Sequence, residues 1–273
     1  VYPAKLKVTS NTSDHECSDT SAPYNNCSKF VAAGAPFNLT VTAHCDDPDQ
    51  TQTNNFSIAG VNLTIEKVEP SEGANGNLEE TTIDITNGVG SSNTQAINEV
   101  GIFTINAKKI TSYLTKNINV EGGTLENIGR FIPNHFTLTS SSVTNADGNF
   151  TYMSQQELDL IYTIEARNAD NEIVQNYTGD FAKSSFAIVA ENIPLPPEVH
   201  TDQTSRLNAE DFKGSWLNGV YTSQSDNKGS FERKSDEVDG PYDNLIFGIK
   251  VNDPDKALLT DLNMNESTTD DCI

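Results

Sequence analysis

The sequence has few basic residues and no long apolar run. Only 17 lysines and arginines stand against 39 aspartates and glutamates among the 273 residues, which gives a formal net charge of −22. No basic patch can offset the repulsion between this chain and nucleic-acid phosphates, so nucleic-acid binding is excluded. No apolar stretch approaches the roughly 18 residues that a membrane-spanning helix needs. The sequence therefore predicts no membrane span in this segment.

Helical periodicity is also missing. Only residues 155–160 and 209–213 could start a helical turn, and both stretches are short. Hydrophobic residues make up only 35% of the chain, yet Phe, Tyr, Ile, Leu and Val recur at short intervals. The chain can therefore bury modest cores, and we expect it to fold rather than to be disordered throughout.

Apolar and polar residues alternate in several short runs. The clearest run has apolar residues at every second position: Phe37, Leu39, Val41 and Ala43. Similar runs, bounded by Gly, Pro, Asn or Asp clusters, occur at residues 61–65, 101–107, 158–166 and 245–251. Many short strands without alternating helices are typical of antiparallel sheets stacked face to face. The sequence predicts an all-β fold with two tandem antiparallel immunoglobulin-like β-sandwich domains.

A weak internal repeat supports two domains. The segments that begin at Phe30 and Phe150 each lead into an alternating strand that ends in alanine, then into an acidic turn and an aromatic residue. Duplication and convergence on a common hairpin pattern both explain this likeness. We expect the boundary in the glycine-containing stretch 121–129, which we interpret as flexible. The predicted domains are residues 1–128 and 129–273.

Four cysteines, Cys17, Cys27, Cys45 and Cys272, are too few and too scattered for a zinc site built from closely spaced pairs. They are better explained as disulfide candidates, and with the many Asn, Thr and Ser residues they indicate an oxidising compartment, the periplasm or the cell surface. Their pairing is open. A local link between Cys17 and Cys27, which flank a polar loop, is the simplest, and Cys272 could pair outside this chain.

The ends of the sequence suggest an excerpt of a longer exported protein. The chain begins with Val1 rather than Met, and no signal-peptide-like apolar segment precedes residues 4–7. In a eukaryotic secreted protein, N-x-[ST] sequons could carry glycans, but a chain rich in Asn and Thr also produces them by chance. Eight sequons occur, at Asn11, Asn26, Asn38, Asn55, Asn62, Asn149, Asn176 and Asn265.

Acidic clusters are the first candidates for a ligand site, because Ca²⁺ takes about six to eight oxygen ligands. The candidates are Asp46, Asp47, Asp49, Asp253 and Asp255. Each cluster contains Asp followed by Pro, which are preferred at the first two positions of a type I turn, so a turn already explains the residues. No EF-hand spacing accompanies them. We therefore expect no cofactor, with Ca²⁺ at these turns as the alternative.

The sequence contains no recognisable catalytic motif. No G-x-S-x-G, H-E-x-x-H or P-loop pattern accompanies the widely separated histidines His15, His44, His135 and His200. A triad assembled in space is the alternative. We expect a non-enzymatic chain.

The single tryptophan, Trp216, has two interpretations. An exposed indole ring could stack on a sugar, whereas a lone tryptophan is more often part of a core. We favour the core, because Leu217 and Val220 beside it suggest a strand that enters the sheet.

Several short sequence motifs, which we call phrases, occur together in this sequence. The most specific is Gly-Arg-Phe-Ile-Pro-Asn-His-Phe, and the others are shorter; they lie at residues 99–104, 129–136, 150–153, 175–179, 181–183, 239–245 and 251–255. In this combination, over roughly residues 30–272, the chain resembles the MshQ-like family of large exported proteins associated with the mannose-sensitive haemagglutinin (MSHA) type IV pilus, in a C-terminal region without a defined function. The resemblance implies a surface-associated protein linked to attachment and supplies no catalytic residues.

These observations lead to two hypotheses from different classes. The first is a structural or adhesive module of an exported MSHA pilus-associated protein, located outside the cell or in the periplasm at a bacterial surface, with pilus or cell-surface proteins as partners. The second is a binding module that recognises glycans or Ca²⁺-bridged partners through loops at one end of a sandwich. A hydrolase would need convergent polar groups in a pocket, which no sequence motif indicates.

Overall fold

The computed structural model describes residues 2–24, 27–192, 201–208, 211–224, 228–242, 244–255 and 258–259. Regular structure in these ranges is nearly all β-strand, which confirms the predicted fold class. The exceptions are two 3-10 turns, η1 (Gly179–Phe181) and η2 (Thr204–Arg206). Of the two candidate helical turns, residues 155–160 form a turn that enters a strand, and residues 209–210 lie outside the described ranges. No helix in the described ranges is long and apolar enough to cross a membrane.

The chain divides into two compact units. Unit 1 comprises residues 1–134 and 167–181, and unit 2 comprises residues 135–166 and 182–273. The chain therefore passes from one unit to the other three times rather than once. Because segment 167–181 completes unit 1, no single cut in the sequence separates the two units.

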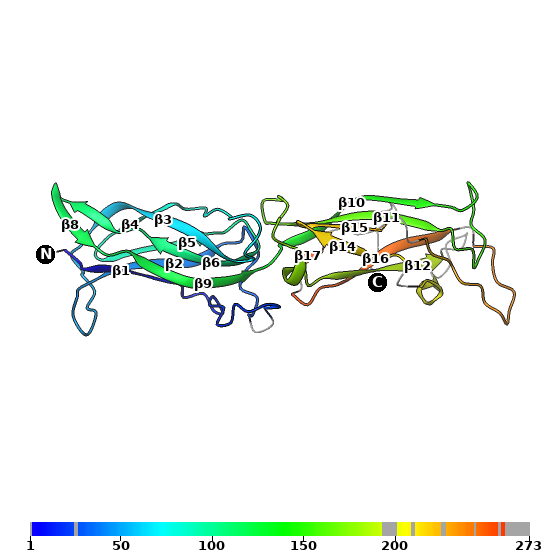
Figure 1. Ribbon diagram of the computed structural model, residues 1–273, viewed down its shortest axis with the longest axis horizontal. Coiled ribbons are helices and arrows are strands. Elements are labelled where there is room, and N and C mark those ends of the chain that lie inside the picture. Colours follow the sequence, from blue (N-terminus) through cyan, green and yellow to red (C-terminus); the bar gives the residue numbers. More distant parts are fainter. Residues whose placement is uncertain are drawn as a thin grey trace. The chain divides into compact units, whose positions relative to one another are not determined.

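Unit 1 contains two antiparallel sheets and a two-stranded hairpin (Figure 1). In the first sheet, β2 (Phe37–His44) lies between β1 (Lys5–Thr9) and β5 (Val89–Gln95). The second sheet has the order β4-β3-β6-β9, formed by β4 (Thr82–Ile85), β3 (Ile58–Glu69), β6 (Gly101–Ala107) and β9 (Gly123–Phe131). The hairpin pairs β7 (Ile110–Tyr113) with β8 (Lys116–Val120).

The core of unit 1 takes one face from each of its two sheets. Burial alternates along the whole of β2, whose four apolar residues are at most 3% exposed, as the sequence pattern predicts. Residues of the second sheet, including Leu63 and Ile105, join the same buried cluster. Phe131 lies within 5.3–5.8 Å, centroid to centroid, of three other phenylalanine rings, those of Phe30, Phe37 and Phe103. Shared burial of two sheet faces makes this unit a β-sandwich.

Strand β9 occupies most of the stretch that we predicted to be a flexible link. Residues 123–131 pair with β6, and the register of this pairing shifts beside Gly101 and Gly129. Both glycines have positive φ angles, +144° and +138°, and a Cβ atom on Gly129 would lie 2.7 Å from the carbonyl oxygen of Gly101. The two glycines therefore permit close contact between the paired strands.

Unit 2 contains two further sheets (Figure 1). The larger sheet has the order β14-β15-β11-β10-β17, formed by β14 (Gly214–Leu217), β15 (Val220–Ser223), β11 (Asp159–Arg167), β10 (His135–Thr144) and β17 (Leu258–Leu259). In the smaller sheet, β12 (Ser185–Asn192) lies between β13 (Thr201–Asp202) and β16 (Leu245–Asn252). Strand β15 pairs antiparallel with β11 and β14, and β12 pairs antiparallel with β13 and β16, whereas the short pairing of β10 with β17 is parallel.

The core of unit 2 also follows the predicted alternation. Along β11, every second residue from Leu160 to Ala166 is buried, and Leu158 just before the strand is 3% exposed. Phe186 of β12 contributes to this core and packs edge-on against Tyr221 of β15, with 4.9 Å between ring centroids. Side chains of the two sheets thus meet, and unit 2 is a second all-β sandwich.

One disulfide lies in unit 1. Cys17 and Cys27 are bonded, with 4.9 Å between their Cα atoms, so the local link that the sequence favoured is confirmed. Cys45 is a free, partly exposed thiol whose sulfur lies 3.6 Å from the hydroxyl of Thr53. Cys272 lies outside the described residues.

We expect the Phe131→Ala variant to lose about 3–5 kcal/mol of unfolding free energy, because it removes a fully buried ring from the middle of the phenylalanine cluster. Urea denaturation measures this loss. The Tyr2→Ala control removes a ring that is 48% exposed and should change stability by less than about 0.5 kcal/mol. A Phe131 variant as stable as this control would show that the cluster does not stabilise unit 1.

Candidate binding site

The first acidic cluster forms the predicted turn. The carbonyl oxygen of Asp47 accepts the N–H of Gln50 at 3.0 Å, and its carboxylate accepts the N–H of Thr51 at 2.7 Å. The hydrogen bonds from Thr51 lower the pKa of the Asp47 carboxyl. Asp46 and Asp49 lie beside Asp47 in this turn.

The second acidic cluster is also a turn, in which the N–H of Asp255 donates to the carboxylate of Asp253 at 3.1 Å. Within the described ranges, no group of three or more His, Cys, Asp or Glu side chains is arranged to hold a metal ion. Each of the two acidic clusters that we considered separately for Ca²⁺ thus forms a turn.

The described histidines lie at separate places. A ring nitrogen of His15 is 2.8 Å from the carbonyl oxygen of Thr12, and a ring nitrogen of His44 is 2.7 Å from the hydroxyl of Thr42. These two histidines belong to unit 1, whereas His135 begins β10 of unit 2. His200 lies outside the described residues.

Trp216 packs among aromatic side chains but is only partly buried. Its ring centroid lies 5.4 Å from that of Tyr221 and 5.7 Å from those of Phe136 and Phe186. The indole N–H donates to the carbonyl oxygen of Ser184 at 3.0 Å. The neighbouring Leu217 is 67% exposed, because successive residues of a strand point to opposite faces. Trp216 thus belongs to the edge of the core, and Leu217 does not contribute to it.

Segment 167–181 supplies unit 1 with a buried polar cluster that sequence reasoning missed. The carboxylate of Glu99, only 5% exposed, accepts the N–H groups of Val100 at 2.9 Å, Gln175 at 3.0 Å and Asn176 at 3.1 Å. Burial raises the pKa of Glu99, and these three backbone hydrogen bonds only partly oppose that effect. The cluster holds the segment in place.

Asn176 completes this cluster and is fully buried. Its side-chain amide donates to the carbonyl oxygens of Ala74 and Val100, both at 2.9 Å, and its side-chain oxygen accepts the N–H of Ala74 at 2.7 Å. This sequon asparagine therefore serves packing and is inaccessible to a glycan. The sequons at Asn26 and Asn265 lie outside the described residues.

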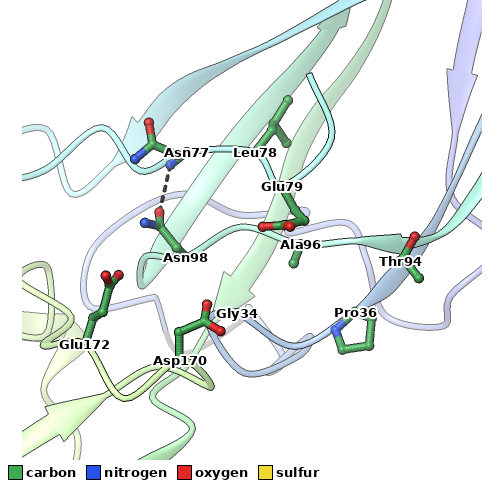
Figure 2. Close-up of a pocket in the computed structure, with 10 residues that line it drawn as sticks. All are labelled: Gly34, Pro36, Asn77, Leu78, Glu79, Thr94, Ala96, Asn98, Asp170 and Glu172. Carbon is green, nitrogen blue, oxygen red and sulfur yellow. Dashed lines mark hydrogen bonds between the residues drawn. The ribbon is translucent and has the colours of Figure 1, made fainter. Parts of the chain in front are cut away.

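A polar hollow of about 340 Å³ lies in unit 1 beside this segment (Figure 2). Three carboxylate side chains line it, those of Glu79, Asp170 and Glu172. The N–H of Asn77 donates to the side-chain oxygen of Asn98 at 2.8 Å along its rim. The hollow offers acidic and amide groups but little apolar surface for a ligand to bury.

A larger groove, of about 680 Å³, lies in unit 2. We call it the aromatic groove; it is lined by residues of the segments 143–153, 231–242 and 245–247, together with Leu158. Its aromatic residues are Phe150, Tyr152, Phe231, Tyr242 and Phe247, and none of the described residues that line it is charged. Concave, mostly apolar sites with a few polar groups are the usual form of small-molecule sites, so this groove is the stronger candidate.

A buried ion pair fixes one part of the groove lining. The guanidinium of Arg206, which is 6% exposed, forms two hydrogen bonds with the carboxylate of Asp239. The same guanidinium lies 4.2 Å from the ring centroid of Phe231 and 5.1 Å from that of Tyr242. The Tyr242 hydroxyl accepts a hydrogen bond from Arg206 at 2.6 Å and donates one to Asp239 at 2.7 Å. Two groove rings are therefore held by one charged centre.

The charges of this centre change the pKa of its acidic member. Burial alone would raise the pKa of Asp239, but hydrogen bonds from the Tyr242 hydroxyl, the Lys234 N–H and Arg206 outweigh it and lower the pKa to about 2. Burial and the bond to Asp239 raise the pKa of Tyr242. Asp239 is therefore ionised at neutral pH and neutralises Arg206. Little in the sequence indicated this ion pair, because Arg206 and Asp239 are 33 positions apart.

The raised pKa of Glu99 gives a testable pH dependence. Because the folded state holds this proton more tightly than the unfolded state, the contribution of Glu99 to stability is greatest below its ordinary pKa of 4.5 and is lost as the pH rises through the folded value. We expect the Glu99→Gln variant to lack this loss, so that its stability relative to wild type improves from pH 4 to pH 7 in urea denaturation. A difference between Glu99→Gln and wild type that stays constant over this pH range would contradict the prediction.

The buried ion pair gives a second prediction. The Asp239→Asn variant should unfold at clearly lower urea concentration at pH 7, because it leaves the Arg206 guanidinium buried without its counter-charge. The lowered pKa means that the wild type loses this stabilisation as the pH falls from 3.8 toward about 2, where the gap between the two proteins should close. Asp236→Asn, in the same loop but exposed, is the matched control. Equal stability of the two variants at pH 7 would refute the role of the pair.

Comparison with known proteins identifies the family. Residues 2–95 match the model of the second domain of DUF6701, and residues 99–273 match the model of its third domain. The search of curated proteins gave no match. Strands β6 to β9 fall within the third-domain match, although they belong to unit 1 in the structure and two of them, β6 and β9, complete its second sheet. Together the two matches span nearly the whole sequence, and the chain belongs to the DUF6701 family.

Proposed function

We propose that this chain is a non-enzymatic structural and adhesive module of an exported bacterial surface protein associated with the MSHA type IV pilus. The observation that carries the proposal is the construction of the chain as two β-sandwich units between which it passes three times. Segment 167–181 is held in unit 1 by the buried cluster around Glu99. Because segment 167–181 belongs to unit 1 but lies in the sequence between the two parts of unit 2, neither unit is formed by one continuous segment, which suits a single structural module.

The chemistry of the chain supports an exported location. The Cys17–Cys27 disulfide is of the kind that persists in oxidising compartments. A net charge of −22 keeps neighbouring copies apart and soluble at a crowded surface. An extracellular or periplasmic module at the bacterial surface is consistent with both features.

The association with the pilus is supported by the sequence phrases. The most specific of them, at residues 129–136, runs from the end of β9 into β10 and so covers the first passage from unit 1 to unit 2. Gly129 within it makes the close contact with β6 described above. These residues therefore form the segment in which the chain first passes from unit 1 to unit 2. We expect a pilus-associated relative with the same architecture to contain the same segment.

Deletion in the bacterium tests this proposal. Removal of the coding region for residues 2–259 should reduce surface attachment several-fold, measured by counting adherent cells, and electron microscopy should show whether assembled pili decrease with it. Reintroduction of the wild-type segment should restore attachment. Unchanged attachment together with unchanged piliation would refute the proposal.

A further inference from the structure

We propose that the aromatic groove of unit 2 is a binding site for a neutral saccharide. The inference rests on the adhesive part of the proposed function and adds to it a ligand class and a location. The described residues that line the groove all belong to unit 2.

Two aromatic rings at the groove are exposed to water. Phe150 is 47% exposed and Tyr152 is 65% exposed, and their ring centroids are 5.1 Å apart in an edge-to-face arrangement. Adjacent exposed rings of this size add to an apolar surface of the kind that marks binding sites in soluble proteins. The rings provide flat faces on which the C–H face of a sugar can stack.

Other rings of the groove are fixed before any ligand arrives. Tyr242 and Phe231 contact the guanidinium of Arg206, whose charge is neutralised by Asp239. A ring already held in one orientation loses little conformational freedom when a ligand stacks on it. The ion pair thus supports the site without offering a charge to the ligand.

The described lining carries no charge, which disfavours an anionic ligand. The chain as a whole carries a net charge of −22, and none of the described residues that line this groove is acidic or basic. An anionic ligand would therefore meet the repulsive field of the protein without a cation among these residues to bind it.

Polar groups at the rim suit hydroxyl groups. The hydroxyl of Thr151 donates to the side-chain oxygen of Asn145 at 3.0 Å and accepts the N–H of Ala146 at 3.0 Å. In the described part of the chain, the amide nitrogen of Asn145 and the whole side chain of Asn149 make no hydrogen bond. Each amide has donors that a sugar hydroxyl can accept, and that of Asn149 also offers an acceptor. A volume of about 680 Å³ fits a ligand of one to a few sugar rings rather than a folded protein.

The test uses the whole chain and a matched set of variants. The purified protein is screened on an array of neutral and sialylated oligosaccharides, and the best neutral compound is titrated by calorimetry. We expect neutral compounds to bind and their sialylated counterparts to bind at least about tenfold more weakly. Phe150→Ala and Tyr152→Ala should each weaken binding about tenfold, whereas Tyr152→Phe keeps the ring and should retain most of it. Tyr2→Ala removes an exposed ring of unit 1 and should have no effect.

Three results would overturn the inference. The first is an array on which no neutral oligosaccharide binds. The second is an affinity that Phe150→Ala and Tyr152→Ala leave unchanged. The third is a change in the NMR chemical shifts of the groove residues when a proline-rich peptide is added but not when any sugar is added. Circular dichroism verifies that each variant is folded, and these substitutions affect exposed rings, so folding should be retained. Absence of saccharide binding by the wild-type protein, together with loss of attachment when the segment is deleted, would refute only this site. Attachment and piliation both unaffected by deletion of the whole segment would refute the proposed function.

Discussion

The fold depends on the need of each sheet to cover its apolar face. Strands such as β2 and β11 carry buried residues at every second position, so a single sheet would leave one face in water. Stacking a second sheet on that face removes the apolar side chains from water, and each unit is built in this way. Phe131 illustrates the result in unit 1, where its ring packs against phenylalanines from other elements of the same core. Burial of these rings is the main favourable contribution to the stability of the sandwich.

Once the sheets are stacked, polar side chains decide how the loops attach. Glu99 and Asn176 are buried polar residues, and each has several hydrogen-bond partners in the chain. A buried carboxylate without such partners would destabilise the unit, so these bonds specify one position for segment 167–181. The cost of burying Glu99 is visible in its raised pKa. Arg206 and Asp239 play the corresponding part in unit 2, where they fix the loop that carries Tyr242.

The two units present different surfaces to possible ligands. The hollow of unit 1 is lined by carboxylates and amides, whereas the groove of unit 2 combines exposed rings with uncharged polar groups. Only the second arrangement lets a ligand bury apolar surface and form hydrogen bonds at the same time. The acidic Asp-Pro stretches, which were the first candidates in the sequence, serve as turns.

Local pattern alone indicated the alternating strands such as β2 and β11, the Asp47 turn and, among the open cysteine pairings, the Cys17–Cys27 link as the simplest, because each depends on residues close together in the sequence. The tertiary structure decided the rest. Glu99 and Asn176 are 77 positions apart, so no local pattern could assign segment 167–181 to unit 1, and the stretch expected to be a link became β9. The aromatic groove likewise joins residues from distant segments. Alternation fixes which face of a strand is apolar, but only packing between distant segments determines what covers that face and what remains open to a ligand.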